Sequence, residues 1–198
     1  ENLTLQNNTA SNDLPLIATL TGPGVITSWA IAPNLPSGLI FETSNGTIWG
    51  VATELQTSPV TYTIWANNSG GSTSATINIT VNDQVPTLLY SPENVTLTRG
   101  QSSSDLPLVP TLSGPGDITS WSINATLPNG LFFGPNNGTL YGISTVNLTT
   151  TTYTIYANNS GGSTSAQINL TILEPIVTLD YNPENFTLVR SIAMTTLY

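Results

Sequence analysis

Residues Tyr62–Val81, "YTIWANNSGGSTSATINITV", alternate apolar and polar side chains on both sides of an Asn-Ser-Gly-Gly run. The second half places Ala75, Ile77, Ile79 and Val81 at every other position, with Ser, Thr or Asn between them. This period of two is typical of a half-buried antiparallel strand, so we expect the four apolar residues to face inward. The central Asn and Gly residues tolerate the positive φ that a chain reversal requires. The stretch therefore predicts a β-hairpin.

The hairpin belongs to an internal repeat. The ten residues 66–75, "ANNSGGSTSA", return unchanged at 157–166. The motif "ENLTL" at Glu1 is matched by "ENVTL" at Glu93 and "ENFTL" at Glu184, which are 92 and then 91 residues apart. Self-similarity at a fixed period is the signature of a tandem array. We therefore expect the chain to be an interior segment of a longer array.

The repeat also predicts the module boundaries. "VPTLLYSP" at 85–92 precedes the second motif and "IVTLDYNP" at 176–183 precedes the third, whereas nothing precedes Glu1. The predicted modules are residues 1–84, which lack the first strand segment; residues 85–175; and residues 176–198, the first strand or strands of a third module.

Composition excludes most catalytic chemistry. The 198 residues include no Cys or His, and 2 basic residues stand against 11 acidic ones, for a formal net charge of −9. Ser-His and Cys-His catalysis and imidazole or thiolate metal sites are therefore excluded. The scarcity of cations argues against binding to nucleic acid or to an anionic membrane surface. The only recurring acids, Asp13 with Asp105 and the Glu of the repeat motif, are far apart in sequence, so we expect no catalytic residues and no enzyme activity.

Turn residues and alternating runs predict six or seven short strands in each module. In the first module we expect strands near Asn2–Leu5, Ile17–Thr21, Ile26–Ile31, Leu39–Phe41, Thr47–Val51 and Thr61–Ala66, followed by the run from Thr73. This density of strands predicts an all-β fold of tandem immunoglobulin-like antiparallel β-sandwiches. Trp29 and Trp121 are the predicted bulky residues at the middle of the two cores.

The ordered motifs "LPSGLIF" at Leu35, "NGTIWG" at Asn45 and "YTIWANNSGG" at Tyr62 all recur between 127 and 172. This series resembles the immunoglobulin-like domains that occur in tandem in archaeal and bacterial surface proteins. These domains are close to the cadherin-like domains of dystroglycan type. The resemblance implies a β-sandwich in an extracellular adhesive or structural protein, with no catalytic or cofactor-binding residues.

Candidate glycosylation sites are frequent. Twelve asparagines begin an Asn-X-Ser/Thr sequon: Asn2, Asn7, Asn45, Asn67, Asn78, Asn94, Asn124, Asn137, Asn147, Asn158, Asn169 and Asn185. Several fall on the outward parity of a strand or in an Asn-Gly turn, where a glycan would not enter a core. The alternative interpretation is that Asn and Thr simply suit turns and exposed strand faces.

No cofactor is expected, and calcium at the module junction is the alternative. Asp83 in "VNDQVP" and Glu93 are hard oxygen donors beside the junction. The next junction reads "ILEPIV", and a full ligand set cannot be named at either, which favours short polar linkers. For Arg99 and Arg190, which recur six residues after the Glu of the motif, a solvated role is expected, with pairing to a nearby carboxylate as the alternative.

These observations predict a non-catalytic extracellular module, part of a glycosylated microbial surface array, stalk or filament. The expected partners are neighbouring copies or other surface proteins, reached by strand addition through residues 176–198, together with covalent glycans. No run of about 20 apolar residues is present, so no membrane insertion is expected in this segment. The alternative is a carbohydrate-binding module in which Trp49 and Trp65 stack on sugar rings.

Overall fold

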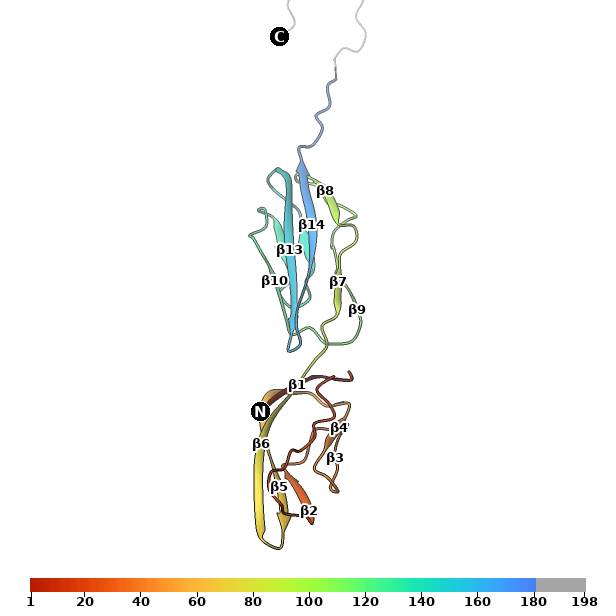
Figure 1. Ribbon diagram of the computed structural model, residues 1–198. Helices are drawn as coiled ribbons and strands as arrows, with labels where there is room; N and C mark the ends of the chain where they lie inside the picture. Colours follow the sequence, from red (N-terminus) through yellow and green to blue (C-terminus); the bar gives the residue numbers. More distant parts are fainter. Residues whose placement is uncertain (181–198) are drawn as a thin grey trace, which may run out of the picture.

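The computed structural model describes residues 1–180, which form two β-sandwiches placed end to end (Figure 1). Strands β1 to β6 make the first sandwich and strands β7 to β14 the second, and residues 83–86 join them. Every regular element within residues 1–180 is a β-strand, so the predicted all-β, immunoglobulin-like fold class is confirmed. The sequon at Asn185 and the third-module segment from 181 onward lie outside the described residues.

The first sandwich is built around the hairpin that the sequence predicts. Tyr62 pairs with Ile77, and the two hairpin strands continue the four-stranded sheet β1-β6-β5-β2. A two-stranded sheet, β3-β4, lies against it. The bounds are β1 Asn2–Gln6, β2 Ser28–Ala32, β3 Leu39–Phe41, β4 Ile48–Gly50, β5 Gln56–Asn68 and β6 Gly71–Asn82.

The second sandwich repeats this plan and adds a further strand pair. Its main sheet has the order β10-β13-β14-β8, and the pairs β11-β12 and β7-β9 complete it. The bounds are β7 Thr87–Leu89, β8 Asn94–Thr98, β9 Thr111–Ser113, β10 Ser120–Ile123, β11 Leu131–Phe133, β12 Leu140–Gly142, β13 Leu148–Asn159 and β14 Gly162–Leu173.

One strand pair in each sandwich is parallel rather than antiparallel. β1 runs parallel to β6, and β8 runs parallel to β14. After β1 the chain crosses to the other layer, where Leu16 bridges to Ile48, instead of turning back beside β1. Parallel partners need such a crossover connection. The register sets Leu3 and Leu5 on the inner face beside Ile79, so alternation in the short first strand still directs its apolar residues inward.

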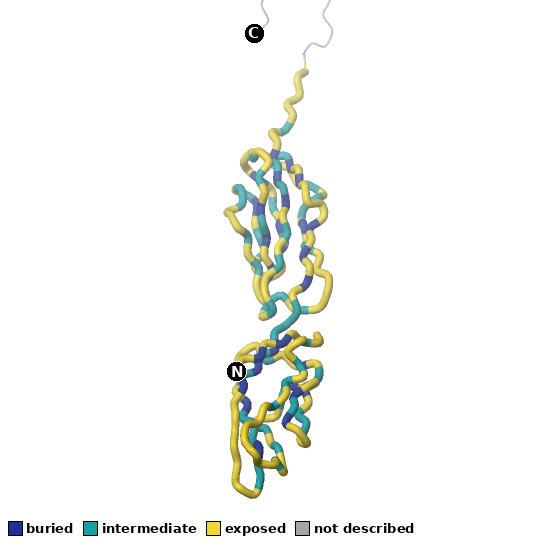
Figure 2. The backbone as a smooth tube through the Cα atoms, viewed as in Figure 1, coloured by how far each residue is buried: buried dark blue, intermediate teal, exposed yellow. Residues whose placement is uncertain are grey.

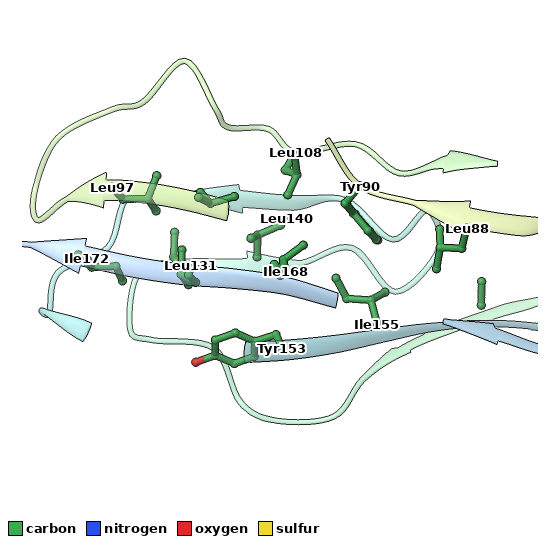
Figure 3. Close-up of a cluster of buried hydrophobic side chains, with 13 residues drawn as sticks. Leu88, Tyr90, Leu97, Leu108, Leu131, Leu140, Tyr153, Ile155, Ile168 and Ile172 are labelled. Carbon is green, nitrogen blue, oxygen red and sulfur yellow. The ribbon is translucent and has the colours of Figure 1, made fainter. Parts of the chain in front are cut away.

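The cores are centred on tyrosine and aliphatic residues, not on tryptophan. Tyr62 is 1% exposed, and Figure 3 shows its counterpart Tyr153 on the floor of the second core. Trp29 and Trp121 are only half-buried, which corrects the prediction that they fill the middle. Their rings lie over turn glycines at the edge: a Cβ added at Gly46 would meet the Trp29 ring at 2.4 Å.

The strand expected at 17–21 is absent from the first sandwich. The equivalent residues of the second sandwich form β9 because β7 pairs with them. Within residues 1–180, nothing equivalent to β7 lies beside residues 17–21. Ala75, expected to face inward, is exposed for the same reason, whereas its counterpart Ala166 is half-buried and packs against the second core.

Candidate functional site

The first sandwich carries an open groove with a volume of about 430 Å³. Residues 16–20 form one wall and residues 73–77 the other. The floor includes Trp29, Gly46, Ile48 and Ile64. A groove between two segments of extended chain, with an apolar floor, has the shape and chemistry that an added β-strand would fill.

In the second sandwich the same place is filled by the chain itself. β7 pairs antiparallel with β9 and packs beside β14. Leu88 and Tyr90, which are 2% and 3% exposed, belong to the same buried core cluster as Leu140 and Ile168 (Figure 3). The Tyr90 hydroxyl donates a 2.6 Å hydrogen bond to the carbonyl of Gly138, and burial raises the pKa of this tyrosine.

Matched positions show the effect of the unfilled groove on burial. Leu108 is 3% exposed and Ile155 is fully buried in the second sandwich. Their counterparts Leu16 and Ile64 are only half-buried in the first. The two modules therefore share a fold but differ in how much apolar surface the described residues cover.

The junction between the sandwiches is held by direct hydrogen bonds from the linker. The Asp83 N–H donates to Ser160 Oγ at 2.9 Å, and the side chain of Asn159 donates to the carbonyl of Gln84 at 2.6 Å. The Gln84 side chain donates to the carbonyl of Asn7 at 2.8 Å. Figure 2 shows the linker as half-buried chain between the two sandwiches.

The second copy of the repeated ten-residue stretch is therefore a docking surface as well as a turn. Gly161 lies so close to the linker that an added Cβ would stand 2.0 Å from the carbonyl oxygen of Asp83. The sequence predicts a hairpin turn with a glycosylation sequon for this stretch and does not predict the contact with the linker. The available signal was its complete identity in both copies, which exceeds what a turn requires.

Both carboxylate oxygens of Asp83 are occupied by backbone groups. Oδ1 accepts from the N–H of Gln84 at 2.8 Å, and Oδ2 accepts from the N–H of Asp117 at 3.0 Å. Glu93, the other calcium candidate, is exposed where β8 begins, and its carbonyl accepts from the N–H of Asn169. Among residues 1–180, no three acidic, His or Cys side chains gather in a way that could hold a metal ion.

The sequons within residues 1–180 all lie at the surface. None of these eleven asparagines is buried; Asn2, Asn45, Asn94, Asn124, Asn137 and Asn147 are exposed, and Asn7, Asn67, Asn78, Asn158 and Asn169 are half-buried.

Two of these asparagines in each sandwich also hydrogen-bond to one another on the outer face of the main sheet, and we call each such set a polar ladder. Asn78 donates to Asn2 Oδ1, and Asn169 donates to Asn94 Oδ1, both at 2.9 Å. A threonine from the neighbouring strand donates to each ladder, Thr61 in the first sandwich. These side-chain hydrogen bonds link the neighbouring strands of each parallel pair.

The aromatic residues proposed for sugar stacking lie in different sheets. Trp49 is on β4, 44% exposed, and Trp65 is half-buried on β5. In the second sandwich Tyr141 instead stacks on Phe132, with ring centroids 5.7 Å apart. Since the two tryptophans belong to opposite layers, they do not form one platform.

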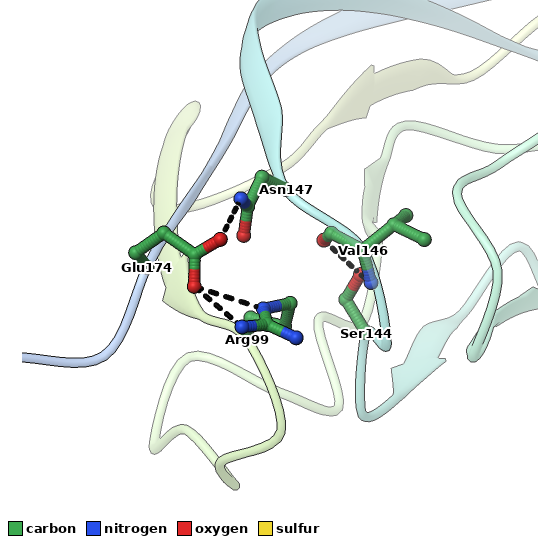
Figure 4. Close-up of polar contacts among 5 residues, drawn as sticks. All are labelled: Arg99, Ser144, Val146, Asn147 and Glu174. Atoms are coloured by element: carbon green, nitrogen blue, oxygen red, sulfur yellow. Dashed lines mark hydrogen bonds and ion pairs between the residues drawn. The ribbon is translucent and has the colours of Figure 1, made fainter.

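Arg99 pairs with a carboxylate at the far end of the second sandwich. Its guanidinium approaches Glu174 Oε2 at 2.6 Å, and Asn147 donates to the other carboxylate oxygen (Figure 4). The hydrogen bond from Asn147 and then those from Arg99 hold the pKa of the Glu174 carboxyl below its ordinary value. Arg99 thus pairs with a carboxylate, the alternative to the expected solvated role.

Comparison with known proteins gives one family and several relatives. A family model described as "Putative Ig domain" matches residues 2–82 and again residues 85–173. The serine-rich adhesin for platelets of Staphylococcus aureus strain MRSA252 is 30% identical over 173 residues, which cover 82% of this chain and 12% of the adhesin. The protein of the same name in strain MSSA476 is also 30% identical, and the chain spans 7% of its length.

Solved structures with similar chains include immunoglobulin and cadherin domains. The N-terminal four Ig domains of Dscam1 isoform 6.9 align with 87% of this chain and 43% of that one, at 17% identity and a TM-score of 0.45. Cadherin domains 1–4 of protocadherin gamma B7 align with 88% of this chain and 49% of that one, at 13% identity and a TM-score of 0.39.

Proposed function

Because both modules of this chain belong to the family described as "Putative Ig domain", we propose that the chain is a non-catalytic structural and adhesive module of an extracellular surface protein. The observation that carries this proposal is the junction. Two sandwiches are joined by four residues whose carbonyl, N–H and side-chain groups are bonded to both of them. A linker held in this way transmits force and orientation along an array, which a flexible tether would not do.

The similarity to the staphylococcal adhesins supports an adhesive role at a cell surface. The acidic side chains give no support to catalysis. Of the carboxyl groups within residues 1–180, Glu54 and Glu174 have a lowered pKa, and hydrogen bonds at exposed positions are the cause in both. A lowered pKa keeps a carboxylate ionised, which suits a hydrogen-bond acceptor and not a general acid. Within residues 1–180 there is no helix long and apolar enough to span a membrane.

The finer proposal is a glycosylated stalk or filament whose partners are neighbouring copies or other surface proteins, reached by strand addition through residues 176–198. The surface position of the eleven described sequons supports the glycan part. Intact-mass measurement of native material would test it, with a series of sugar-sized mass increments as the expected result. An intact mass equal to the polypeptide alone would refute it.

Adhesion is tested by coating beads with the chain. We expect coated beads to cluster with one another or to bind cell surfaces in flow, more strongly than beads coated with an unrelated immunoglobulin-like domain of similar charge. Equal behaviour of the two bead populations in both assays would overturn the adhesive proposal and leave a purely structural role.

A further inference from the structure

We propose that the outer face of the β11–β12 hairpin is a platform for a sugar chain that is attached to Asn137, in the turn of the same hairpin. This inference deepens the glycan part of the proposed function and rests on it. It names the modified asparagine, the ligand, which is a pyranose ring on the side-chain nitrogen, and the aromatic side chains that the ring covers.

An exposed aromatic pair lies on this face. Phe132 on β11 pairs directly with Tyr141 on β12, and the two side chains are 56% and 46% exposed. Their ring centroids are 5.7 Å apart, with 29° between the ring planes. Contiguous exposed apolar side chains on a folded protein mark sites of binding. The pair therefore has the chemistry of a docking surface, and the occupant follows from what lies beside it.

The side chain of Asn137 lies above the same face. Leu131 is buried, Phe132 is exposed and Phe133 packs against the core. This alternation makes the side-chain direction outward at Gly134. A Cβ added at Gly134 would collide with Asn137 Oδ1, so the carboxamide of Asn137 occupies the space above Gly134. Phe132 is two residues away, or about 7 Å along a strand.

A hydrogen bond fixes the orientation of this carboxamide. Asn137 Oδ1 accepts from the N–H of Thr139 at 3.1 Å, and Nδ2 donates to no group within residues 1–180. In five other sequons the side-chain nitrogen is itself a hydrogen-bond donor: Asn67, Asn78, Asn147, Asn158 and Asn169. A glycan is attached through this nitrogen. Modification of Asn137 therefore breaks no hydrogen bond of the folded turn.

The covalent step needs a co-substrate from outside the chain. A transferase supplies a sugar whose anomeric carbon carries a phosphate or diphosphate leaving group. Nδ2 of Asn137 bonds to that carbon, the carbon–oxygen bond to the phosphate breaks, and Nδ2 gives up one of its two hydrogens as a proton. The product is still an amide, so its carbonyl oxygen continues to accept from Thr139.

The attached sugar fits the aromatic pair. One face of a pyranose ring is lined by C–H groups that pack on an aromatic ring, while its hydroxyl groups remain in water. Phe132 and Tyr141 offer large apolar areas for such a contact. Because the glycan is tethered at Asn137, its effective concentration at this face is high, and docking does not depend on free sugar.

The equivalent hairpin of the first sandwich differs at one position that matters here. Asn45 begins the matching sequon, and its Oδ1 accepts from the N–H of Thr47 at 3.0 Å. The place of Gly134 is taken by Glu42, whose Cβ needs the space that the Asn137 carboxamide occupies in the second sandwich. We therefore assign the docked sugar to the second hairpin, and Asn45 provides a matched control.

The test uses the full chain secreted from a eukaryotic host that attaches high-mannose glycans. Endoglycosidase H trims each glycan to a single N-acetylglucosamine, and mass spectrometry of peptides reports the occupancy of each asparagine. Thr139→Ala removes the sugar at Asn137 but keeps the backbone N–H of the turn. Thr47→Ala does the same at Asn45. The same variants made without glycans correct for the loss of the threonine side chain.

We expect Asn137 to be occupied and its single sugar to raise the Tm of the second sandwich by about 4 °C. The sugar at Asn45 should raise the Tm of the first sandwich by less than half as much. In a double-mutant cycle, Phe132→Thr combined with Tyr141→Thr should abolish the effect of the Asn137 sugar. NMR should show an upfield ring-current shift of the acetyl methyl group that disappears in the same double variant.

An equal effect of the Asn137 sugar with and without the aromatic pair would overturn the proposal. So would an unoccupied Asn137 in a chain whose other sequons carry sugars. Self-association of the sugar-free chain that Phe132→Thr abolishes would assign this face to a second copy, which also overturns the proposal. Each of these results leaves glycans at other sequons possible, whereas native material without any glycan mass refutes the glycosylated stalk itself, so the two failures are distinguishable.

Discussion

Gly161 and Gly70 have identical neighbours in sequence and different neighbours in space. Gly161 meets the carbonyl of Asp83, whereas the nearest atom to a Cβ added at Gly70 is Asn68 Oδ1, 3.2 Å away. Neither residue has a positive φ, so backbone conformation does not separate them. Substituting each glycine in turn therefore separates the effect of the linker contact from the effect of the turn itself.

We predict that Gly161→Ala loosens the junction, because the methyl group displaces Asp83 and breaks hydrogen bonds worth about 0.5–1.5 kcal/mol each. Residual dipolar couplings and small-angle scattering should report wider interdomain motion. Gly70→Ala, measured under conditions where the chain is monomeric, is the matched control and should leave both readouts unchanged. Equal effects would show that the glycine serves only the turn.

Tyr90 gives a second prediction for a single residue. Tyr90→Phe leaves the carbonyl of Gly138 without its donor in a buried site, so we expect the second sandwich to lose about 1–3 kcal/mol in urea unfolding. Tyr141→Phe, at a side chain 46% exposed, is the control and should cost much less.

Tyr90 also makes the stability of the second sandwich depend on pH in the alkaline range. Burial raises the pKa of Tyr90 above its ordinary value of 10.0, so the folded state holds the proton more tightly than the unfolded state. Its contribution to stability is complete below pH 10 and is lost as the pH rises beyond it. Tyr90→Phe should flatten the alkaline part of the stability profile, and an unchanged slope would assign that loss to other groups.

At the scale of elements, the presence or absence of one strand decides how firmly its neighbours are held. β9 is a strand because β7 pairs with it, whereas no strand among residues 1–180 pairs with residues 17–21, which have the same alternation. β-propensity reflects packing against neighbours more than an intrinsic preference. The segment in the first sandwich therefore remains irregular.

We predict that matched truncations beside the groove differ in cost. Leu108→Ala removes a side chain that is 3% exposed and should destabilise the second sandwich by about 2–4 kcal/mol. Leu16→Ala removes a half-buried counterpart and should cost less than half as much in the monomeric chain. Denaturant titrations with a probe in each sandwich would separate the two, and equal losses would contradict the open groove.

The pair of Arg99 and Glu174 joins the end of β8 to the end of β14. The pKa of Glu174 is depressed in the folded state, so its stabilising contribution is present above pH 4.5 and is lost as the pH falls through the folded value. We expect Glu174→Gln to cause a small fall in Tm at pH 7, reduced by salt because the pair is exposed, and a smaller fall as the pH is lowered into the acid range. A fall of equal size at pH 3 would point to packing instead of charge.

At the scale of the whole molecule, the polar groups of the linker between the sandwiches form hydrogen bonds with other groups of the protein. The Asp83 carboxylate accepts backbone hydrogen bonds from Gln84 and Asp117 and so holds the linker to the second sandwich, while the Gln84 side chain bonds to the carbonyl of Asn7 in the first. We predict that chelation of divalent cations with EDTA leaves the radius of gyration and both unfolding transitions unchanged. A chain that becomes more flexible in EDTA and recovers with calcium would show that the junction binds the ion.

The sequence by itself determined the fold class, the hairpin and the repeat. Alternation over Ala75, Ile77 and Ile79 is a local property that survives in any surroundings, and it correctly places the last two inside. The predictions that the structure contradicts share one physical cause. Ala75 is exposed, residues 17–21 are not a strand, and Trp29 lies at an edge, because each position depends on what the neighbouring segment supplies.

Only the tertiary structure decided what the repeated "ANNSGGSTSA" contacts. Its turn geometry follows from Asn and Gly in the sequence, but its second role depends on a linker that is some 75 residues away along the chain. Likewise, the structure showed that the place which β7 fills in the second sandwich is an open groove with an apolar floor in the first. Local patterns specify elements, whereas burial and docking are properties of the segments that meet.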